Sequence, residues 1–209
     1  MARKKAIDTD AFTFTTPKCY DVTIEGVTPL LFNKLNLDDF RLTKAEKPNQ
    51  EKVDNVILER HNWPKKAYYD ENYHVYIPGE NLKESLKDGA KYWGAKIAGS
   101  GNKTYTDVIT KGVVCGPLYL GITRDDLIPF EAVVNGNPSR GKNNGVRVLR
   151  IRPMVDAGWK GTFRLHAFDG RLTPEVLSVI ITYAGYGGVC DWRPTFGRYA
   201  LVELKEVVQ

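Results

Sequence analysis

The stretch that decides the fold is Gly161-Thr-Phe-Arg-Leu-His-Ala-Phe168, followed by a turn at Asp169-Gly170 and by a segment from Leu172 to Ala184. In the first part, apolar and polar residues alternate with period two, which predicts a strand with one buried face. In the second part, apolar residues recur at helical spacing behind Thr173-Pro174, which is typical of a helix start. Together they predict a strand that leads directly into a helix.

The next segment, Gly185-Tyr-Gly-Gly-Val-Cys-Asp-Trp-Arg-Pro-Thr-Phe-Gly-Arg-Tyr199, precedes a final predicted strand from Tyr199 to Leu204. Its four glycines and one proline favour a mobile or tightly turned backbone. Aromatic and arginine side chains are interleaved with the glycines, namely Tyr186, Trp192, Arg193, Phe196 and Arg198. This mixture is typical of surfaces that bind single-stranded nucleic acid. Trp192 itself is predicted either to pack on the core or to stack on a base.

These elements resemble the C-terminal signature of the repeat-associated mysterious protein (RAMP) superfamily, the ferredoxin-like RNA-binding subunits of CRISPR effectors. Two further segments are similar to that family and occur in the matching order. Tyr20 to Phe32 is similar to its first strand with the following Pro-Leu turn, and Tyr76 to Ala90 is similar to the entry of its first helix. With Val189-Cys-Asp-Trp-Arg-Pro194, the pattern most resembles small backbone-subunit-like proteins of phages and prophages.

The resemblance implies an α+β, ferredoxin-like (RRM-like) fold, in which an antiparallel four-stranded sheet is backed by two helices. The length of 209 residues indicates one domain, 1–209. Within it we expect a flexible arm at 1–18, a polar and exposed insertion at 33–62 and a long excursion at 123–157. The excursion resembles the thumb-like hairpin of CRISPR backbone subunits.

The middle of the chain predicts four further elements. A hairpin is expected between Ala67 and Ile77, a helix from Glu80 to Ala98, a short element from Tyr105 to Ile109, and a strand from Val113 to Ile122. The tyrosines near the hairpin are read as core packing or as a surface that stacks on bases, and they are Tyr68, Tyr69, Tyr73 and Tyr76.

Basic residues are concentrated between Gly136 and Arg164. The segment holds Arg140, Lys142, Arg147, Arg150, Arg152, Lys160 and Arg164, against the single acid Asp156. Such an excess can neutralise several phosphates and release their counterions. The alternative is a basic face that is merely solvated.

Composition excludes some classes of protein. The net charge is +5, and no apolar run approaches the length of about 20 residues that spans a bilayer, so a cytoplasmic protein is expected, in a bacterial or phage-infected cell. Three cysteines without short pairing indicate neither a disulfide framework nor a zinc site. We expect no cofactor.

No catalytic constellation stands out. His61, His74 and His166 are the only histidines, and none neighbours a set of residues typical of a ribonuclease. Asp38 and Asp39 could in principle support metal-dependent cleavage, as in RAMP subunits that cut target RNA with an aspartate. We therefore assign neither a catalytic residue nor a metal site.

The leading hypothesis is a non-catalytic protein that binds single-stranded nucleic acid and assembles side by side along the strand. RNA and DNA both stay open, because no pattern indicates a contact to a 2′-hydroxyl. The expected binding residues are Lys83, Lys87, Arg140, Lys142, Arg147, Arg150, Arg152, Trp192, Arg193, Phe196 and Arg198. The alternatives are a structural subunit that binds only proteins and an endoribonuclease of the same fold.

Overall fold

The computed structural model describes residues 16–35, 55–135 and 147–207 of the chain. Several predictions concern other residues: most of the N-terminal arm, Asp38 and Asp39, and the hairpin tip with Arg140 and Lys142 all lie outside the described residues. Within the described part, no helix has both the length and the apolar character needed to cross a membrane.

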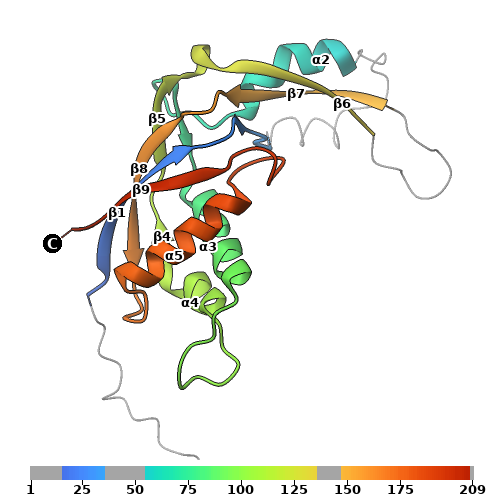
Figure 1. Ribbon diagram of the computed structural model, residues 1–209. Coiled ribbons are helices and arrows are strands. Elements are labelled where there is room, and N and C mark those ends of the chain that lie inside the picture. Colours follow the sequence, from blue (N-terminus) through green and yellow to red (C-terminus); the bar gives the residue numbers. More distant parts are fainter. Residues whose placement is uncertain (1–15, 36–54, 136–146, 208–209) are drawn as a thin grey trace, which may run out of the picture.

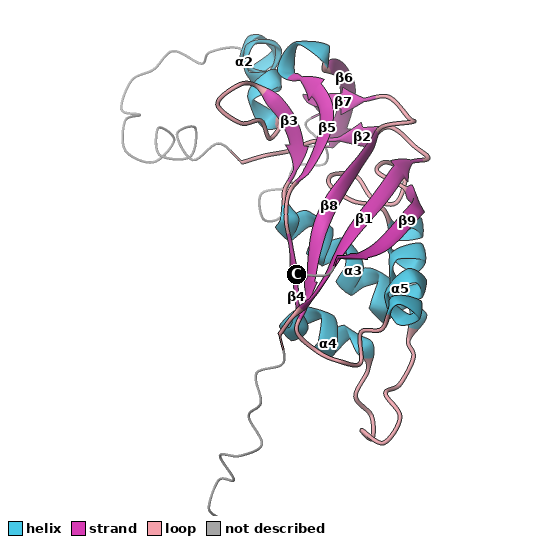
Figure 2. Ribbon diagram, turned by 90° about the vertical axis from the view of Figure 1, so that its left-hand side faces the viewer, coloured by secondary structure: helices cyan, strands magenta, loops and turns pink. Residues whose placement is uncertain are grey.

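Four antiparallel strands form the main sheet, in the order β4-β8-β1-β9 (Figure 2). Their bounds are β1 Lys18–Gly26, β4 Val113–Cys115, β8 Lys160–Ala167 and β9 Tyr199–Val207. On β1, Tyr20, Val22 and Ile24 are buried and alternate with more polar residues that face the other way. A four-stranded antiparallel sheet is therefore present, as the sequence predicts.

Helices α3 (Gly79–Trp93) and α5 (Pro174–Gly187) cover one face of this sheet (Figure 2), and their apolar faces are buried against it. The sequence predicts that the first helix continues to Ala98, but α3 ends at Trp93. Gly94 stops it, because its φ of 68° is left-handed and its amide bonds back to the helix. A third helix, α4 (Tyr105–Gly112), replaces the predicted short element.

The predicted strand from Val113 to Ile122 is divided at Gly116-Pro117. Its first part is β4, and its second part is β5 (Leu118–Thr123), which pairs with β3 (His74–Ile77) in a separate sheet. Proline donates no backbone hydrogen bond, so it cannot continue a ladder inside a sheet. The hairpin predicted from Ala67 is reduced to one bridge, between Tyr69 and Val75, since β3 pairs mainly with β5.

A long antiparallel hairpin extends beyond the body of the protein (Figure 1). It consists of β6 (Ile128–Asn135) and β7 (Arg147–Val155), which confirms the predicted excursion for its described strands. The short 3₁₀ helix η3 (Arg124–Asp126) leads into β6, and β2 (Leu30–Leu31) pairs with the end of β7 nearest the body. We call this end, where the hairpin joins the body, its root.

The insertion at 33–62 is not simply an exposed loop. Its described C-terminal part forms helix α2 (Asn55–Asn62), which the 3₁₀ helix η2 (Trp63–Lys66) continues. Both pack against β7, and Glu59 of α2 is buried there. Ile57, Arg60 and His61 are exposed, as expected for the insertion, but Glu59 is buried by partners that its local sequence does not reveal.

Candidate nucleic-acid interface

The glycine-rich loop (residues 188–198) returns the chain from α5 to β9. It is fastened to β2 and to the residue before it: the Asp191 amide donates to the Leu31 carbonyl at 3.0 Å, and the Gly197 amide donates to the Pro29 carbonyl at 2.8 Å. Gly197 has a φ of 74°, and a Cβ there would lie 2.0 Å from the Val189 carbonyl oxygen. Of the two predicted states of this backbone, the structure shows the tightly turned one, which is a fixed support for side chains.

Three aromatic rings join this loop to the root of the hairpin. The ring centroid of Trp192 lies 5.8 Å from that of Phe130 on β6 and 6.3 Å from that of Phe196, and Phe130 and Phe196 are 5.2 Å apart. These separations are typical of favourable aromatic pairs. Trp192 is half-buried in this cluster and is not part of the main core under the sheet. Its first role is therefore to hold the loop against the hairpin.

Replacing Trp192 by alanine is expected to lower the free energy of unfolding by about 2 kcal/mol, because roughly half of a large ring surface becomes exposed to water. Urea denaturation followed by circular dichroism measures this change. Tyr186→Ala, which removes an exposed ring of the neighbouring helix, is the control and is expected to change stability far less. Equal stability of Trp192→Ala and the parent protein would contradict the packing role.

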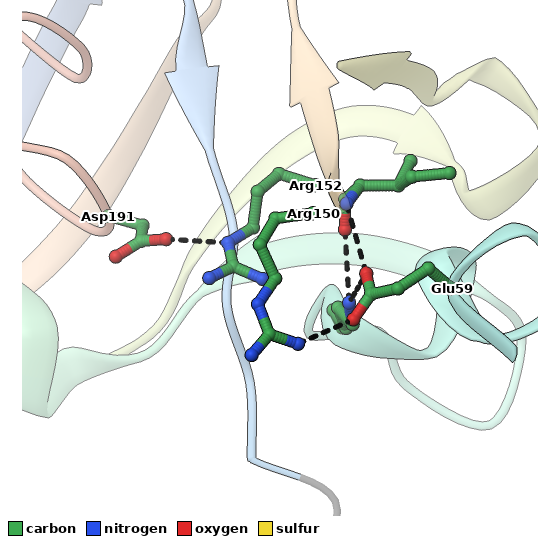
Figure 3. A network of polar contacts seen from close by, with 6 residues as sticks. Glu59, Arg150, Arg152 and Asp191 are labelled. Atoms are coloured by element: carbon green, nitrogen blue, oxygen red, sulfur yellow. Dashed lines mark hydrogen bonds and ion pairs between the residues drawn. The ribbon is translucent and has the colours of Figure 1, made fainter. Parts of the chain in front are cut away.

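Arg152 lies at the root of β7 and does not point into solvent. Its Nε donates to the Asp191 carboxylate at 2.9 Å (Figure 3), and its guanidinium carbon lies 5.9 Å from the Trp192 ring centroid. Only 12% of the side chain is exposed. Arg152 therefore connects the hairpin to the glycine-rich loop. Its predicted phosphate contact stays a prediction and would require this pair to open.

A second network fastens the other side of the root. The Glu59 carboxylate accepts hydrogen bonds from the Ile151 amide at 3.0 Å, from Arg150 at 3.0 Å and from Lys66, whose ammonium also donates to the Ile151 carbonyl at 3.1 Å (Figure 3). The side chains of Glu59 and Lys66 are 10% and 18% exposed. Arg150, predicted to grip phosphate, is thus engaged with a buried acid.

Burial and hydrogen bonding act in opposite directions on Glu59. Burial raises the pKa of the carboxyl, but the bonds from Ile151, Lys66 and Arg150 outweigh it and hold that pKa below its usual value. For Lys66 burial dominates: it lowers the pKa of the ammonium, although the Glu59 carboxylate raises it. The two groups therefore depend on each other, because each offsets part of the cost of burying the other's charge.

The open face of the main sheet carries paired charges. Arg164 donates to Asp21 at 2.6 Å, and Lys160 lies 3.4 Å from Glu25. Thr23 and Thr162 share a hydrogen bond of 2.8 Å between these pairs. On the four strands, Phe163, Tyr20 and Tyr199 are buried on the helix side, so no large aromatic ring is available for base stacking on this face.

The other predicted binding residues differ in whether an acidic residue pairs with them and in how far they are exposed. Arg193 donates to Asp88 at 2.9 Å, and Lys87 pairs with Glu84 at 3.0 Å, both at the surface. Lys83 is half-buried on α3. Arg147 and Arg198 are exposed, and no ion pair holds either of them within the described part of the chain. Among the predicted binding residues that the structure describes, these two arginines are exposed and not held by an acid.

Arg193 lies beside a shallow hollow of about 560 Å³ between α3 and the glycine-rich loop, lined by Asp88, Gly187, Cys190, Asp191, Trp192, Arg193 and Pro194. Each of its two carboxylates is already paired with an arginine, Asp88 with Arg193 and Asp191 with Arg152. The hollow therefore offers the Trp192 ring and the partly exposed guanidinium of Arg193.

The histidines lie apart from one another. His166 Nδ1 is 3.1 Å from the Cys19 sulfur on the main sheet, His74 is 3.4 Å from Asp70, and His61 is exposed at the end of α2. No group of three or more His, Cys, Asp or Glu residues is placed to hold a metal ion among the residues described. No nuclease constellation is assembled from them.

Burial raises the pKa of both the Cys115 and the Cys190 thiols to about 12. Since the thiolate is the reactive form, we expect both cysteines in the folded protein to react with iodoacetamide at pH 8 on the order of a hundredfold more slowly than glutathione. Mass spectrometry of peptides after timed labelling measures this rate, and labelling in urea provides the control. Rapid modification of either cysteine in the folded protein would contradict the expectation.

Sequence reasoning identified the basic residues but not their partners. Glu59, Asp191 and Asp88 each neutralise a predicted binding residue, and Phe130 completes the aromatic cluster. Of these, only Asp191 carried a usable signal, because it adjoins Trp192 in the glycine-rich loop. The others lie far from their partners in sequence.

No family model matches the sequence, and no curated protein matches it. Among solved structures, 125 chains match. One of them belongs to the cryo-EM structure of the Type III-B Cmr-beta complex bound to cognate target RNA, with a TM-score of 0.58 and 11% identity over 92% of this chain. This chain spans 61% of the length of that chain. At this identity the likeness concerns the fold, and it supports the RAMP-like fold that the sequence resemblance implied.

Proposed function

We propose that this chain binds single-stranded RNA without cleaving it, as one subunit of a multisubunit ribonucleoprotein complex. The fold is similar to that of a chain in a Type III-B Cmr complex that was solved with cognate target RNA, which favours RNA over DNA as the ligand. We also propose that the β4-β8-β1-β9 sheet and its two helices are of the ferredoxin-like class. The phage origin that the sequence suggests is likewise a proposal.

The observation that carries the proposal is the projecting hairpin with its fastened root. Strands β6 and β7 extend away from the core, so they contribute little to it (Figure 1). Nevertheless, two partly or fully buried carboxylates, Glu59 and Asp191, hold the root in place. A rigidly oriented extension that stabilises little within its own domain is well suited to contact a ligand or a neighbouring subunit.

The charge of the hairpin favours a phosphate backbone as that ligand. By sequence, residues 128–155 carry five basic residues, Arg140, Lys142, Arg147, Arg150 and Arg152, and the one acid Glu131. The paired arginines fix the root, so among the described basic residues of the hairpin Arg147 is the one left for phosphate. The phosphate contacts of Arg140 and Lys142 stay predictions, and Arg198 on the glycine-rich loop is a second exposed candidate.

Fluorescence anisotropy with labelled oligouridylate and oligodeoxythymidylate at several salt concentrations tests the proposal. We expect binding to RNA that weakens as salt rises. Arg147→Ala and Arg198→Ala should each reduce affinity and flatten the logarithmic salt dependence by about 0.7 for each phosphate that the variant no longer neutralises. Arg171→Ala is the matched control, since Arg171 is equally exposed, pairs with Asp169, and lies at the opposite end of α5.

Absence of binding to either oligonucleotide would contradict the proposal. Intact RNA on a denaturing gel after prolonged incubation is expected, and shortened products would show that the chain is a ribonuclease. Variants at Arg150 and Arg152 are unsuitable for this test, because their removal disturbs the root of the hairpin as well as the charge.

We also infer that copies of this chain assemble side by side along the RNA. The hairpin projects beyond the body of its own protein, so it can contact a neighbouring copy that is bound to the same RNA strand. Light scattering at saturating protein is expected to show several copies on one long oligonucleotide. A single copy per long strand would contradict assembly while leaving RNA binding intact.

A purely protein-binding subunit is the second candidate, and one observation favours it. Val133 and Ile128 are 64% and 40% exposed on the hairpin, where they offer apolar contact area to another protein. In that case the parent protein binds neither oligonucleotide, and Val133→Ser changes the oligomeric state.

A further inference from the structure

A row of tyrosine rings lies along the small sheet of β3 and β5. We call it the tyrosine row, and its members are Tyr119, Tyr76, Tyr68, Tyr69 and Tyr73. Ring centroids are 5.5 Å apart between Tyr119 and Tyr76, 6.1 Å between Tyr76 and Tyr68, and 5.8 Å between Tyr69 and Tyr73. The contacting rings therefore fall into two groups: Tyr119, Tyr76 and Tyr68 form one, and Tyr69 and Tyr73 form the other.

Two cations complete the row. The Lys34 ammonium lies 5.7 Å from the Tyr68 ring and 6.0 Å from the Tyr69 ring, so it bridges the two groups. The Arg124 guanidinium lies 4.6 Å from the Tyr73 ring at one end. All three separations are within the range of cation–π attraction. Aromatic faces interleaved with Lys and Arg are the arrangement that binds unpaired bases.

Part of the tyrosine row is exposed, whereas tyrosines packed in a core would be covered. Tyr73 and Tyr119 are 51% and 47% exposed, whereas Tyr68, Tyr69 and Tyr76 are half-buried. The reading of these tyrosines as core packing is confirmed for Tyr68 and Tyr69, which pack against the core, and is wrong for Tyr73, which is exposed.

Tyr73 is also held in an unusual backbone conformation, with a φ of 63°. A bulky residue rarely adopts this conformation, and it persists only where its surroundings impose it. Here the Asp70 carboxylate accepts hydrogen bonds from the Asn72 and His74 amides, which fixes the turn that presents the ring. Strain of this kind is concentrated at ligand sites.

The tyrosine row adjoins the hairpin through η3. Arg124 both covers Tyr73 and lines a cleft of about 420 Å³ together with His61, Trp63, Pro64, Lys65, Asp125 and Leu127. The 3₁₀ helix that begins at Arg124 leads directly into β6, and β3, β5 and the hairpin lie at the same end of the molecule in both views (Figures 1 and 2). An RNA strand that follows the hairpin from Arg147 to its root can therefore continue over the row.

We propose that the tyrosine row stacks on unpaired bases of the RNA that the hairpin holds by its phosphates. The inference rests on the proposed function and assigns it a second, base-directed surface. Asp70, Asp125 and Asp126 border the row, and their carboxylates disfavour phosphate there. Base faces carry no charge, so they are the part of a nucleic acid that this surface accepts.

The test compares two labelled oligonucleotides of equal length, an oligoadenylate and an abasic strand with the same phosphates. In the full chain, Tyr73→Ala and Tyr119→Ala remove exposed rings, and Tyr73→Phe and Tyr119→Phe retain them. We expect each alanine variant to bind oligoadenylate about tenfold more weakly, and the phenylalanine variants to stay within about twofold of the parent protein. Binding of the abasic strand is expected to change in none of them.

Tyr92→Ala is the matched control, since Tyr92 is 75% exposed on α3 and lies outside the tyrosine row. Unchanged oligoadenylate affinity in both alanine variants overturns the inference and leaves the proposed function standing. Equal losses on the abasic strand overturn it as well, because a stacking surface needs bases.

If the alanine variants instead alter self-association and bind RNA normally, the tyrosine row contacts protein and the inference is wrong. Failure of the parent protein to bind either oligonucleotide overturns the inference together with the proposed function. Melting curves for each variant show whether a decrease in affinity reflects a loss of folding.

Discussion

Replacing Glu59 by glutamine is expected to lower the free energy of unfolding by about 3 kcal/mol, one of the two largest effects of a single substitution in this protein. The change leaves the Lys66 ammonium partly buried without a carboxylate, and it replaces one of the two oxygens that accept from Arg150, Lys66 and the Ile151 amide by an NH2 group, which donates. An unpaired buried charge costs more than the loss of an ordinary hydrogen bond. Urea denaturation measures the change.

The same carboxylate gives the stability a defined dependence on pH. Because the pKa of Glu59 is lower in the folded protein than its ordinary value of 4.5, its contribution is complete above pH 4.5 and is lost as the pH falls through the lowered value. Glu59→Gln is expected to be less stable than the parent protein near neutral pH and to lack this component of acid sensitivity.

Glu84→Gln is the control for both measurements. Glu84 also pairs with a lysine, Lys87, but its side chain is 58% exposed, so a loss of less than about 1 kcal/mol is expected. Similar losses for Glu59→Gln and Glu84→Gln would show that the buried network does not stabilise the root of the hairpin.

Gly197→Ala is expected to destabilise the protein by about 3 kcal/mol or more, because two penalties coincide. The added Cβ would lie 2.0 Å from the Val189 carbonyl oxygen, and a φ of 74° is unfavourable for alanine. The loop can relieve the clash only by moving away from Pro29 and Val189, to which Gly197 is hydrogen-bonded. Thermal unfolding followed by circular dichroism measures the loss.

Gly187→Ala is the matched control in the same segment. A Cβ at Gly187 meets no heavy atom within 4 Å beyond its own helix, and the residue ends α5. Alanine is favoured over glycine in a helix by about 0.5 to 1 kcal/mol, so little change or a slight gain is expected. Comparable losses of stability at both positions would mean that the close packing around Gly197 does not account for the destabilisation.

The sequence by itself determined the strands and helices of the main sheet and the existence of the hairpin. Period two in residues 161–168 and helical spacing after Thr173 each depend on neighbours a few residues away, as do turn residues such as Gly94. Such signals are local and survive in any environment that buries one face. The prediction of one strand from Val113 to Ile122 was wrong at Gly116-Pro117, although the signal there is equally local, since proline breaks a ladder wherever it stands.

Only the tertiary structure decided which basic side chains are available to bind phosphate. Within the basic run that ends at Arg164, four residues are paired with acids from distant parts of the chain: Lys160 with Glu25, Arg164 with Asp21, Arg150 with Glu59, and Arg152 with Asp191.

The tyrosine row likewise combines rings from two segments with Lys34 and Arg124, which are close only after folding. The physical reason is that ion pairs and ring contacts depend on separation in space over a few ångströms, while the sequence records only separation along the chain.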